Sequence, residues 1–251
     1  MKRLLCIILC LGIVMLFTAC GTDGSADEQD NAEEVAETQE PTEAPIEHPV
    51  HAAWFDDAVF VGDSITVMLE YYCENDPEAL GKAQFYCAES LGYNNALWDL
   101  NDEYAVHPYY RGEQHLTENC AELTGATKVF IMLGMNDLET YGVDGTLDAC
   151  KTLVKKILSH TPDVKIYLES VTPMLKSFEK TNLNNSVIDK FNVKLKEYCE
   201  KEKYKYLDIN SIMRDKNGAL TPEYCSDPEV MGIHFTTDAC AKWADYLKNN
   251  V

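Results

Sequence analysis

Short apolar runs that alternate with amphipathic helical patterns constrain this chain more than any other feature of its sequence. Five runs have the length and composition of buried strands: residues 58–61, 84–88, 128–133, 164–168 and 204–208. Between these runs and after the last one, apolar residues recur at steps of three and four, as they do along one face of a helix. Strands that alternate with helices predict a parallel sheet with helices on both faces. We therefore predict an α/β domain with about five parallel strands.

The helical pattern is clearest in four segments, residues 65–73, 147–158, 187–198 and 237–247. Their apolar stripes are expected to pack on the sheet as core. The stretch 93–123 has no such periodicity and is rich in Tyr and Trp. Because a long irregular loop in a compact domain is often functional, we expect this stretch to shape a substrate pocket. In parallel sheets the ligand lies beyond the carboxyl ends of the strands.

Residues 1–19 have the composition of a lipoprotein signal peptide. A basic start, Met1-Lys2-Arg3, precedes an apolar run that is too short to span a bilayer comfortably. Small residues directly before Cys20 resemble a bacterial lipobox, in which the chain is cut before the cysteine and the thiol is diacylated. Ordinary cleavage after Ala19 without a lipid is the alternative. Two or three acyl chains on Cys20 would anchor the protein stably, so we expect an extracytoplasmic protein with a lipid anchor in the membrane.

Residues 20–50 are expected to form a disordered acidic linker behind the lipidated cysteine. Residues 21–50 contain ten Asp and Glu and no Lys or Arg. Such a segment cannot bury enough apolar surface to offset its chain entropy. Residues 51–251 keep 19 basic and 32 acidic residues, a net charge of −13, which argues against nucleic acid as a partner. We expect one folded domain over residues 51–251, acting as a monomer.

Seven cysteines lie in residues 51–251, and an odd number cannot all pair within the chain. None lies in a CxxC motif or in a Cys/His pattern with the spacing of metal ligands, so we predict no metal and no cofactor. Export permits disulfides, but free buried thiols suit an organism that lives without oxygen equally well. The sequence leaves the disulfide state open.

Three short motifs carry side chains that can perform acyl transfer. Ser64, in Gly-Asp-Ser after the first strand, stands at a strand-to-helix turn near unpaired backbone N–H groups. Asn136, after the third strand, offers an amide N–H to a developing oxyanion. His234, just before the last helix, can accept a proton from a serine hydroxyl. Taken alone, the Ser64 motif is also explained as a helix cap, and a turn at Asn136 and a surface histidine at His234 are the favoured interpretations.

Taken together, Val-Phe-Val-Gly-Asp-Ser, Ile-Met-Leu-Gly-Met-Asn-Asp and Gly-Ile-His-Phe-Thr resemble the SGNH/GDSL hydrolase superfamily in order, spacing and context. The resemblance runs from about residue 58 to residue 247. It implies a three-layer, flavodoxin-like fold and a serine hydrolase that acts on ester bonds.

The resemblance also implies a role for each motif residue. Ser64 would attack the ester carbonyl, and His234 would be the general base. Asn136 and the backbone N–H of Ser64 would donate to the oxyanion. The family adds a backbone donor from a glycine after the second strand; here Gly92 is the candidate, and Ser90 is the alternative.

One departure from the family concerns the acid that orients the histidine. The family usually has Asp three residues before the His, whereas this chain has Met231. The segment before His234 reads as if it were lengthened by a few residues. We favour Asp227 as the acid, with Glu229 as the alternative. A backbone carbonyl that orients His234 in a Ser-His dyad is the third possibility.

Other polar residues near the motifs are given structural roles. We expect Asp63 and Asp137, which stand beside Ser64 and Asn136, to fix loop geometry through backbone hydrogen bonds. His107, His115 and His160 lie outside any recognisable catalytic position, so surface or pocket roles are expected.

These features favour an extracytoplasmic esterase that removes an acyl group, with acetyl expected, from carbohydrate or a cell-envelope glycan. The substrate would be a small-molecule or glycan ester. An O-acyltransferase on the same machinery is one alternative. A non-catalytic glycan-binding lipoprotein on a hydrolase scaffold is another, because position 231 is Met.

Overall fold

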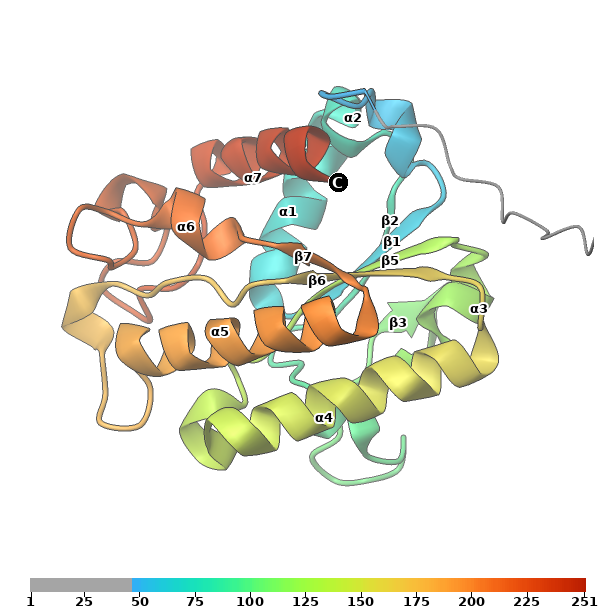
Figure 1. The fold of residues 1–251 in the computed structure, drawn as a ribbon, viewed down its shortest axis with the longest axis horizontal. Coiled ribbons are helices and arrows are strands. Elements are labelled where there is room, and N and C mark those ends of the chain that lie inside the picture. The colour runs from blue at the N-terminus through green and yellow to red at the C-terminus, as the bar shows by residue number, and fades with distance from the viewer. Residues whose placement is uncertain (1–46) are drawn as a thin grey trace, which may run out of the picture. The chain divides into compact units, whose positions relative to one another are not determined.

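The computed structural model describes residues 47–251 (Figure 1). The predicted signal peptide, Cys20 and nearly all of the acidic linker lie outside the described residues. The packed part begins just before the predicted boundary at residue 51. Val50 is buried, and its N–H donates a 2.8 Å hydrogen bond to the carbonyl of Lys248 in the last helix. Within the described part of the chain, no helix combines the length and apolarity that a bilayer crossing needs.

A five-stranded parallel sheet forms the centre of the domain, in the order β2-β1-β5-β6-β7. The strands are β1 (Ala58–Gly62), β2 (Gln84–Cys87), β5 (Lys128–Met132), β6 (Lys165–Glu169) and β7 (Lys205–Leu207). All five predicted strands are confirmed to within a residue or two. They read as continuous apolar runs because helices cover both faces of a parallel sheet.

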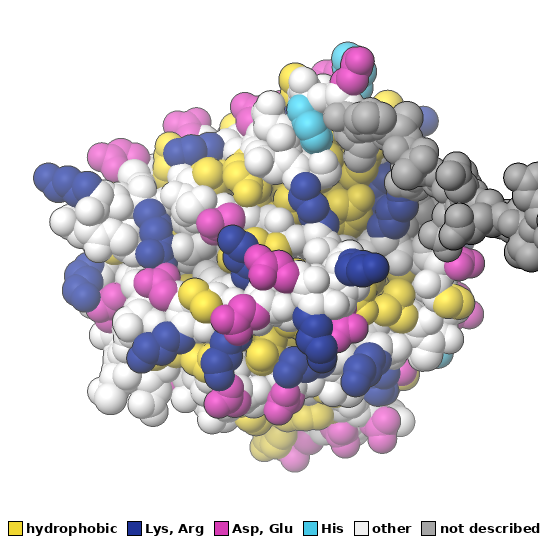
Figure 2. All heavy atoms as spheres, viewed as in Figure 1, with side chains coloured by type: hydrophobic (Ala, Val, Ile, Leu, Met, Phe, Trp, Pro, Cys, Tyr) yellow, Lys and Arg dark blue, Asp and Glu magenta, His cyan; other side chains and the backbone are white. Residues whose placement is uncertain are grey.

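The four predicted helices are also confirmed. They are α1 (Ser64–Asn75), α4 (Leu138–His160), α5 (Asn185–Glu202) and α7 (Thr237–Asn250). α1 and α7 lie together on one face of the sheet, and α4 and α5 lie together on the other (Figure 1). Three helices of four or five residues, α2 (Pro77–Leu80), α3 (Cys120–Thr124) and α6 (Ile209–Met213), are too short for a periodic pattern to predict. Lysines and carboxylates are interspersed over the face that α4 and α5 present (Figure 2).

A ladder of aromatic rings crosses four neighbouring strands. Phe85, Phe60, Phe130 and Tyr167 are register partners on β2, β1, β5 and β6. Successive ring centroids lie 5.3, 4.6 and 4.3 Å apart, and the rings are stacked. Because a slip of one residue would turn each ring to the opposite face of the sheet, this ladder fixes the register of the strands. Burial of the Phe60 and Phe130 rings stabilises the fold by about 2 kcal/mol each, whereas Phe85 at the edge is only partly buried.

The register also brings the carboxyl ends of three strands to one level. Gly62 at the end of β1 pairs with Cys87 of β2 and with Met132 of β5. The residues that follow these three strands therefore emerge at the same edge of the sheet. These are the segments that contain Ser64, Ser90 and Asn136.

The stretch 93–123 is more ordered than predicted. It contains 3-10 turns at Asn95–Leu97 and Thr117–Asn119, a small hairpin of β3 (Tyr109–Tyr110) and β4 (Glu113–Gln114), and helix α3. The elements are too short to leave a periodic signal in the sequence.

All seven cysteines of the domain are free thiols in this structure. Cys120, Cys150, Cys199, Cys225 and Cys240 are buried. Burial raises the pKa of Cys120 and of Cys150 to about 12, so these two thiols are protonated at neutral pH and pack as small apolar side chains.

Candidate active site

Ser64 and His234 are 170 residues apart in the chain, and their side chains meet at the carboxyl edge of the sheet. Ser64 is the first residue of α1, and His234 lies in the loop that leads to the N-cap of α7, Thr236. The distance from His234 Nε2 to Ser64 Oγ is 2.9 Å. Both side chains are partly accessible, so the pair can be reached from solvent.

Asp227 completes a chain of three polar side chains. Its Oδ2 lies 2.7 Å from His234 Nδ1, and its Oδ1 accepts hydrogen bonds of 3.1 Å from the backbone N–H groups of Ile233 and His234. The carbonyl of Asp227 accepts N–H groups from Val230 and Gly232. The residues between Asp227 and His234 therefore form a compact turn that folds back on the carboxylate.

This turn explains how the chain accommodates Met231 where the family resemblance leads one to expect Asp. The extra residues extend the loop outward, and Met231 is exposed on it. Glu229 is exposed too, and its side chain makes no hydrogen bond or ion pair among residues 47–251. The structure thus brings Asp227, and not Glu229, to the imidazole.

The charge of Asp227 determines which ring nitrogen of His234 donates to it. Burial raises the pKa of Asp227, but hydrogen bonds from the His234 ring, the Cys225 thiol and the His234 backbone outweigh burial and hold the pKa below its usual value. Asp227 is therefore ionised at neutral pH, and a carboxylate can only accept hydrogen bonds. His234 Nδ1 consequently donates to Asp227, and its Nε2 faces the Ser64 hydroxyl.

Asn136 lies across from this trio, after β5. Its side chain is exposed to the cavity, and its Nδ2 donates to the carbonyl of Leu91 at 3.0 Å. Nδ2 also lies 3.4 Å from Oδ2 of Asp63. These contacts fix the plane of the amide beside Ser64.

Gly92 does not occupy the donor position that the family resemblance led us to expect. Its backbone N–H donates a 2.7 Å hydrogen bond to Asn95 Oδ1, and the residue is buried outside the cavity. Gly92 is needed for another reason, since a Cβ at this position would lie 2.6 Å from Asp137 Oδ2. Ser90, the alternative, lines the cavity in a left-handed conformation with φ of 62°.

Asp63 and Asp137 hold the two loops of the site, as predicted. Asp63 Oδ1 accepts the N–H of Ile65 at 2.9 Å and so caps α1. Asp137 accepts the backbone N–H groups of Tyr93 and Asn94, each at 2.8 Å, and thereby ties down the loop that contains Ser90. Burial raises the pKa of Asp63 to about 7.

A cavity of about 390 Å³ opens over these side chains. It is lined by Ser64, Met68, Glu89, Ser90, Asn136, Ser226, Asp227, Met231 and His234. Met68, Glu89 and Ser226 were not predicted. Glu89 was nonetheless accessible to sequence reasoning, because it stands two residues beyond the carboxyl end of β2, on the ligand side of a parallel sheet.

The expectation that residues 93–123 shape the substrate pocket is wrong. None of the residues lining this cavity comes from that stretch. Tyr93 is fully buried in the core, and His107 is buried with its ring nitrogens bonded to the Trp98 carbonyl and to Thr117 Oγ1. The aromatic residues of the stretch were a misleading signal because several of them serve packing.

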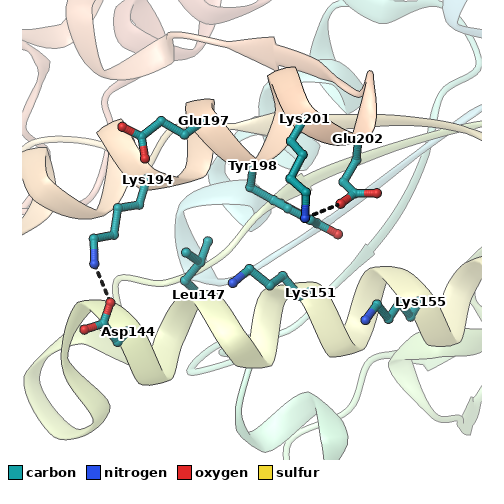
Figure 3. A pocket seen from close by; sticks show the side chains of 9 residues that line it. All are labelled: Asp144, Leu147, Lys151, Lys155, Lys194, Glu197, Tyr198, Lys201 and Glu202. Atoms are coloured by element: carbon teal, nitrogen blue, oxygen red, sulfur yellow. Dashed lines mark hydrogen bonds and ion pairs between the residues drawn. The ribbon is translucent and has the colours of Figure 1, made fainter.

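A second hollow, of about 450 Å³, lies between α4 and α5 (Figure 3). Four lysines line it, but Lys194 pairs with Asp144 and Lys201 pairs with Glu202. It contains no pair of nucleophile and base. Among residues 47–251, no group of three or more His, Cys, Asp or Glu side chains is placed to hold a metal ion.

Comparison with protein families agrees with this geometry. Residues 60–241 match the model of the GDSL-like lipase/acylhydrolase family. The chain belongs to this family. It is accordingly an enzyme, a serine hydrolase that acts on ester bonds.

A curated relative of this GDSL-family enzyme is the N-acylneuraminate cytidylyltransferase of Streptococcus agalactiae serotype III. The two are 33% identical over 114 residues, which is 45% of this chain. The aligned part spans only 25% of the relative's length.

Solved structures with the same fold include a GDSL-like lipase from Bacteroides thetaiotaomicron, 17% identical with a TM-score of 0.58. The match covers 81% of this chain and 90% of that one. The catalytic domain of the Streptococcus pneumoniae peptidoglycan O-acetyltransferase A is 20% identical with a TM-score of 0.51, over 76% of this chain and 90% of that one. At these identities the likeness establishes the fold alone.

Proposed function

We propose that Ser64 is the nucleophile of an esterase, that His234 is its general base, and that Asp227 orients and stabilises the imidazole. The observation that carries this proposal is the continuous hydrogen-bonded path from Asp227 through His234 to Ser64 Oγ, with contacts of 2.7 and 2.9 Å. Nucleophile, base and orienting group within hydrogen-bonding reach are the signature of activated-serine catalysis.

In the proposed reaction, Ser64 Oγ attacks the ester carbonyl while its proton passes to His234 Nε2. The carbonyl oxygen becomes an oxyanion beside the amide of Asn136 and the backbone N–H groups of Ser64 and Ser90. As this intermediate collapses, the departing alkoxide oxygen takes the proton from His234 and leaves as the alcohol, and an acyl-enzyme remains on Ser64. Water, deprotonated by His234, then attacks the acyl-enzyme. Collapse releases the acid, and His234 returns the proton to Ser64 Oγ.

We propose a short acyl ester, acetyl above all, on carbohydrate or a cell-envelope glycan as the substrate. The cavity is small and carries hydroxyl and amide groups from Ser90, Ser226 and Asn136, which suit the hydroxyls of a sugar. The peptidoglycan O-acetyltransferase A that shares the fold is named for the acetylation of a glycan. The fold shared with the O-acetyltransferase favours acyl transfer to a sugar hydroxyl as the second candidate.

The membrane location is a proposal that rests on residues 1–20. If Cys20 is lipidated, the mature chain partitions with the membrane fraction, and Cys20→Ser releases it or leaves it unprocessed. Mass spectrometry of the purified chain, with a search for a diacylglyceryl cysteine at its new N-terminus, checks this expectation.

Hydrolysis of p-nitrophenyl acetate by the purified chain tests the chemistry. We expect turnover by the wild type and a loss of at least about 1,000-fold in kcat/KM for Ser64→Ala and for His234→Ala. A fluorophosphonate probe labels Ser64 in the wild type. A folded wild type that neither labels nor turns over would indicate a binding protein instead.

The choice between hydrolase and transferase needs a different readout. An acetylated aryl ester is incubated with oligosaccharide acceptors, and free acetate and acetylated saccharide are both measured. Acetate as the main product supports the esterase, whereas acetylated saccharide as the main product supports the O-acyltransferase.

A further inference from the structure

The walls of the active-site cavity carry negative charge, and His234 is the basic side chain among them. Of the residues lining the cavity, Glu89 and Asp227 are carboxylates, and none is Lys or Arg. Asp227 is committed to His234 through a 2.7 Å hydrogen bond. Glu89 is exposed, and its side chain makes no hydrogen bond or ion pair among the described residues. Its carboxylate therefore has no protein partner at the wall of the cavity.

The position of Glu89 is fixed by the fold. The carboxyl end of β2 is level with that of β1, because Cys87 pairs with Gly62. Glu89 therefore leaves the sheet at the same edge as Ser64. The loop that follows is held at Tyr93 and Asn94 by the buried carboxylate of Asp137.

An unpaired carboxylate at the wall of a cleft affects charged substrates more than neutral ones. Two unit charges a few ångströms apart at a protein surface interact strongly enough to change an equilibrium on the order of ten-fold. Low-dielectric walls focus the field and increase the effect, and added salt reduces it. The net charge of −13 on residues 51–251 acts in the same direction at longer range.

We propose that Glu89 determines substrate specificity by excluding anionic esters, so that the enzyme acts on acyl esters of neutral or ammonium-bearing sugars. This inference rests on the proposed function, since it concerns the same cavity. It identifies the substrate class by charge: an ester next to a carboxylate or phosphate is a poor substrate. A free amine close to the ester improves binding.

Three acetate esters of nearly equal size test the proposal on the purified full-length chain. They are phenyl acetate, 3-carboxyphenyl acetate and 3-(trimethylammonio)phenyl acetate, with acetate release followed by pH-stat. We expect kcat/KM of the wild type to be highest for the cationic ester and lowest for the anionic one. The three leaving groups differ in reactivity. The decisive quantity is therefore kcat/KM for each charged ester divided by kcat/KM for phenyl acetate, and how this ratio changes between variants.

In Glu89→Gln we expect the ratio of anionic to neutral ester to rise about ten-fold and the ratio of cationic to neutral ester to fall by a similar factor. In the wild type, 1 M NaCl shrinks both preferences. Glu200→Gln is the matched control. Glu200 is exposed near the end of α5, which leads into the amino end of β7 and so lies at the opposite edge of the sheet from Ser64. The same change of net charge there leaves the ratios unchanged.

Ratios in Glu89→Gln equal to those of the wild type, with all three esters still hydrolysed, would overturn the role of Glu89 and leave the proposed esterase intact. Equal shifts in Glu89→Gln and Glu200→Gln would also overturn it, since they would show an effect of net charge alone. Absence of hydrolysis of all three esters by the wild type would overturn the proposed function, and this inference with it.

Discussion

Asp227 Oδ2 and His234 Nδ1 are joined by a 2.7 Å contact although the two residues are seven positions apart in the chain. The carbonyl of Asp227 closes the intervening turn by accepting backbone N–H groups, while its carboxylate accepts the N–H groups of Ile233 and His234. The same residue thus shapes the loop and holds the imidazole. The longer spacing changes the loop and keeps the geometry of a Ser-His-Asp trio.

Replacement of Asp227 by Asn is expected to lower kcat for p-nitrophenyl acetate by about 100- to 10,000-fold. An amide can donate to Nδ1, which favours the tautomer whose Nε2 carries a proton and cannot accept one from Ser64. The measurement is steady-state kinetics at pH 7 to 9, with circular dichroism to confirm folding.

Glu229→Gln is the matched control for this variant, because Glu229 lies on the same turn but is exposed and unpaired. Its kcat is expected to equal that of the wild type within about two-fold. A large loss in Glu229→Gln together with an active Asp227→Asn would mean that the turn rearranges and that Glu229 is the acid.

The sequence predicted the sheet, and the positions of three polar side chains at one edge of it, because both leave local signals. Buried parallel strands read as apolar runs, and Ser64, Asn136 and His234 each stand at the end or beginning of a predicted element. What failed depends on side-chain hydrogen bonds within an irregular segment. The N–H of Gly92 is taken by Asn95, and His107 is enclosed by Trp98 and Thr117, which no periodicity reveals.

The acid that orients His234 could be predicted only in part from the sequence. Sequence spacing narrowed the acid to two carboxylates, and only the turn that bonds back to Asp227 distinguishes them. The prediction that residues 93–123 shape the substrate pocket failed for a different reason. Tyr and Trp side chains serve in cores as readily as in sugar sites, so the composition of residues 93–123 could not identify its role.

Gly62→Ala is expected to destabilise the domain and displace Ser64. A Cβ on Gly62 would lie 1.8 Å from Thr66 Oγ1 and 3.0 Å from the carbonyl of Met132, so α1 would have to move away from β1. We expect a loss of about 3 kcal/mol in the free energy of unfolding and a fall in kcat. Urea denaturation measures the first. Adding Thr66→Ala removes the shortest contact and should recover part of the loss; no recovery would place the strain elsewhere.

Asp137→Ala is expected to loosen the loop that contains Ser90. The substitution leaves the N–H groups of Tyr93 and Asn94 without their acceptor, and Tyr93 is fully buried. We expect a loss of about 3 kcal/mol in the free energy of unfolding. Hydrogen exchange should rise at the amides of Tyr93 and Asn94 and remain unchanged in α5. Unchanged exchange at these two amides would show that the carboxylate does not hold the loop.

The free energy of unfolding is expected to fall as pH rises from about 5 to about 8. Glu169 is buried at the end of β6, where its Oε2 accepts a 2.7 Å hydrogen bond from Trp243 Nε1, and burial raises its pKa to about 8. Above its ordinary pKa of 4.5, the unfolded chain releases a proton that the folded chain retains. Each such group therefore lowers stability by at most about 1.4 kcal/mol per pH unit until its folded pKa is reached.

Glu169→Gln separates this residue from Asp63, whose pKa is raised by burial only to about 7. The Gln side chain keeps an acceptor for Trp243 and removes the ionisation. From pH 5 to 7 both proteins should lose stability, because Asp63 titrates in both. The variant should lose it less steeply, because Glu169 no longer contributes. From pH 7 to 8 the wild type should continue to lose stability while the variant levels off. Urea unfolding at pH 5, 6, 7 and 8 gives both curves, and parallel curves across the last interval would contradict the assignment to Glu169.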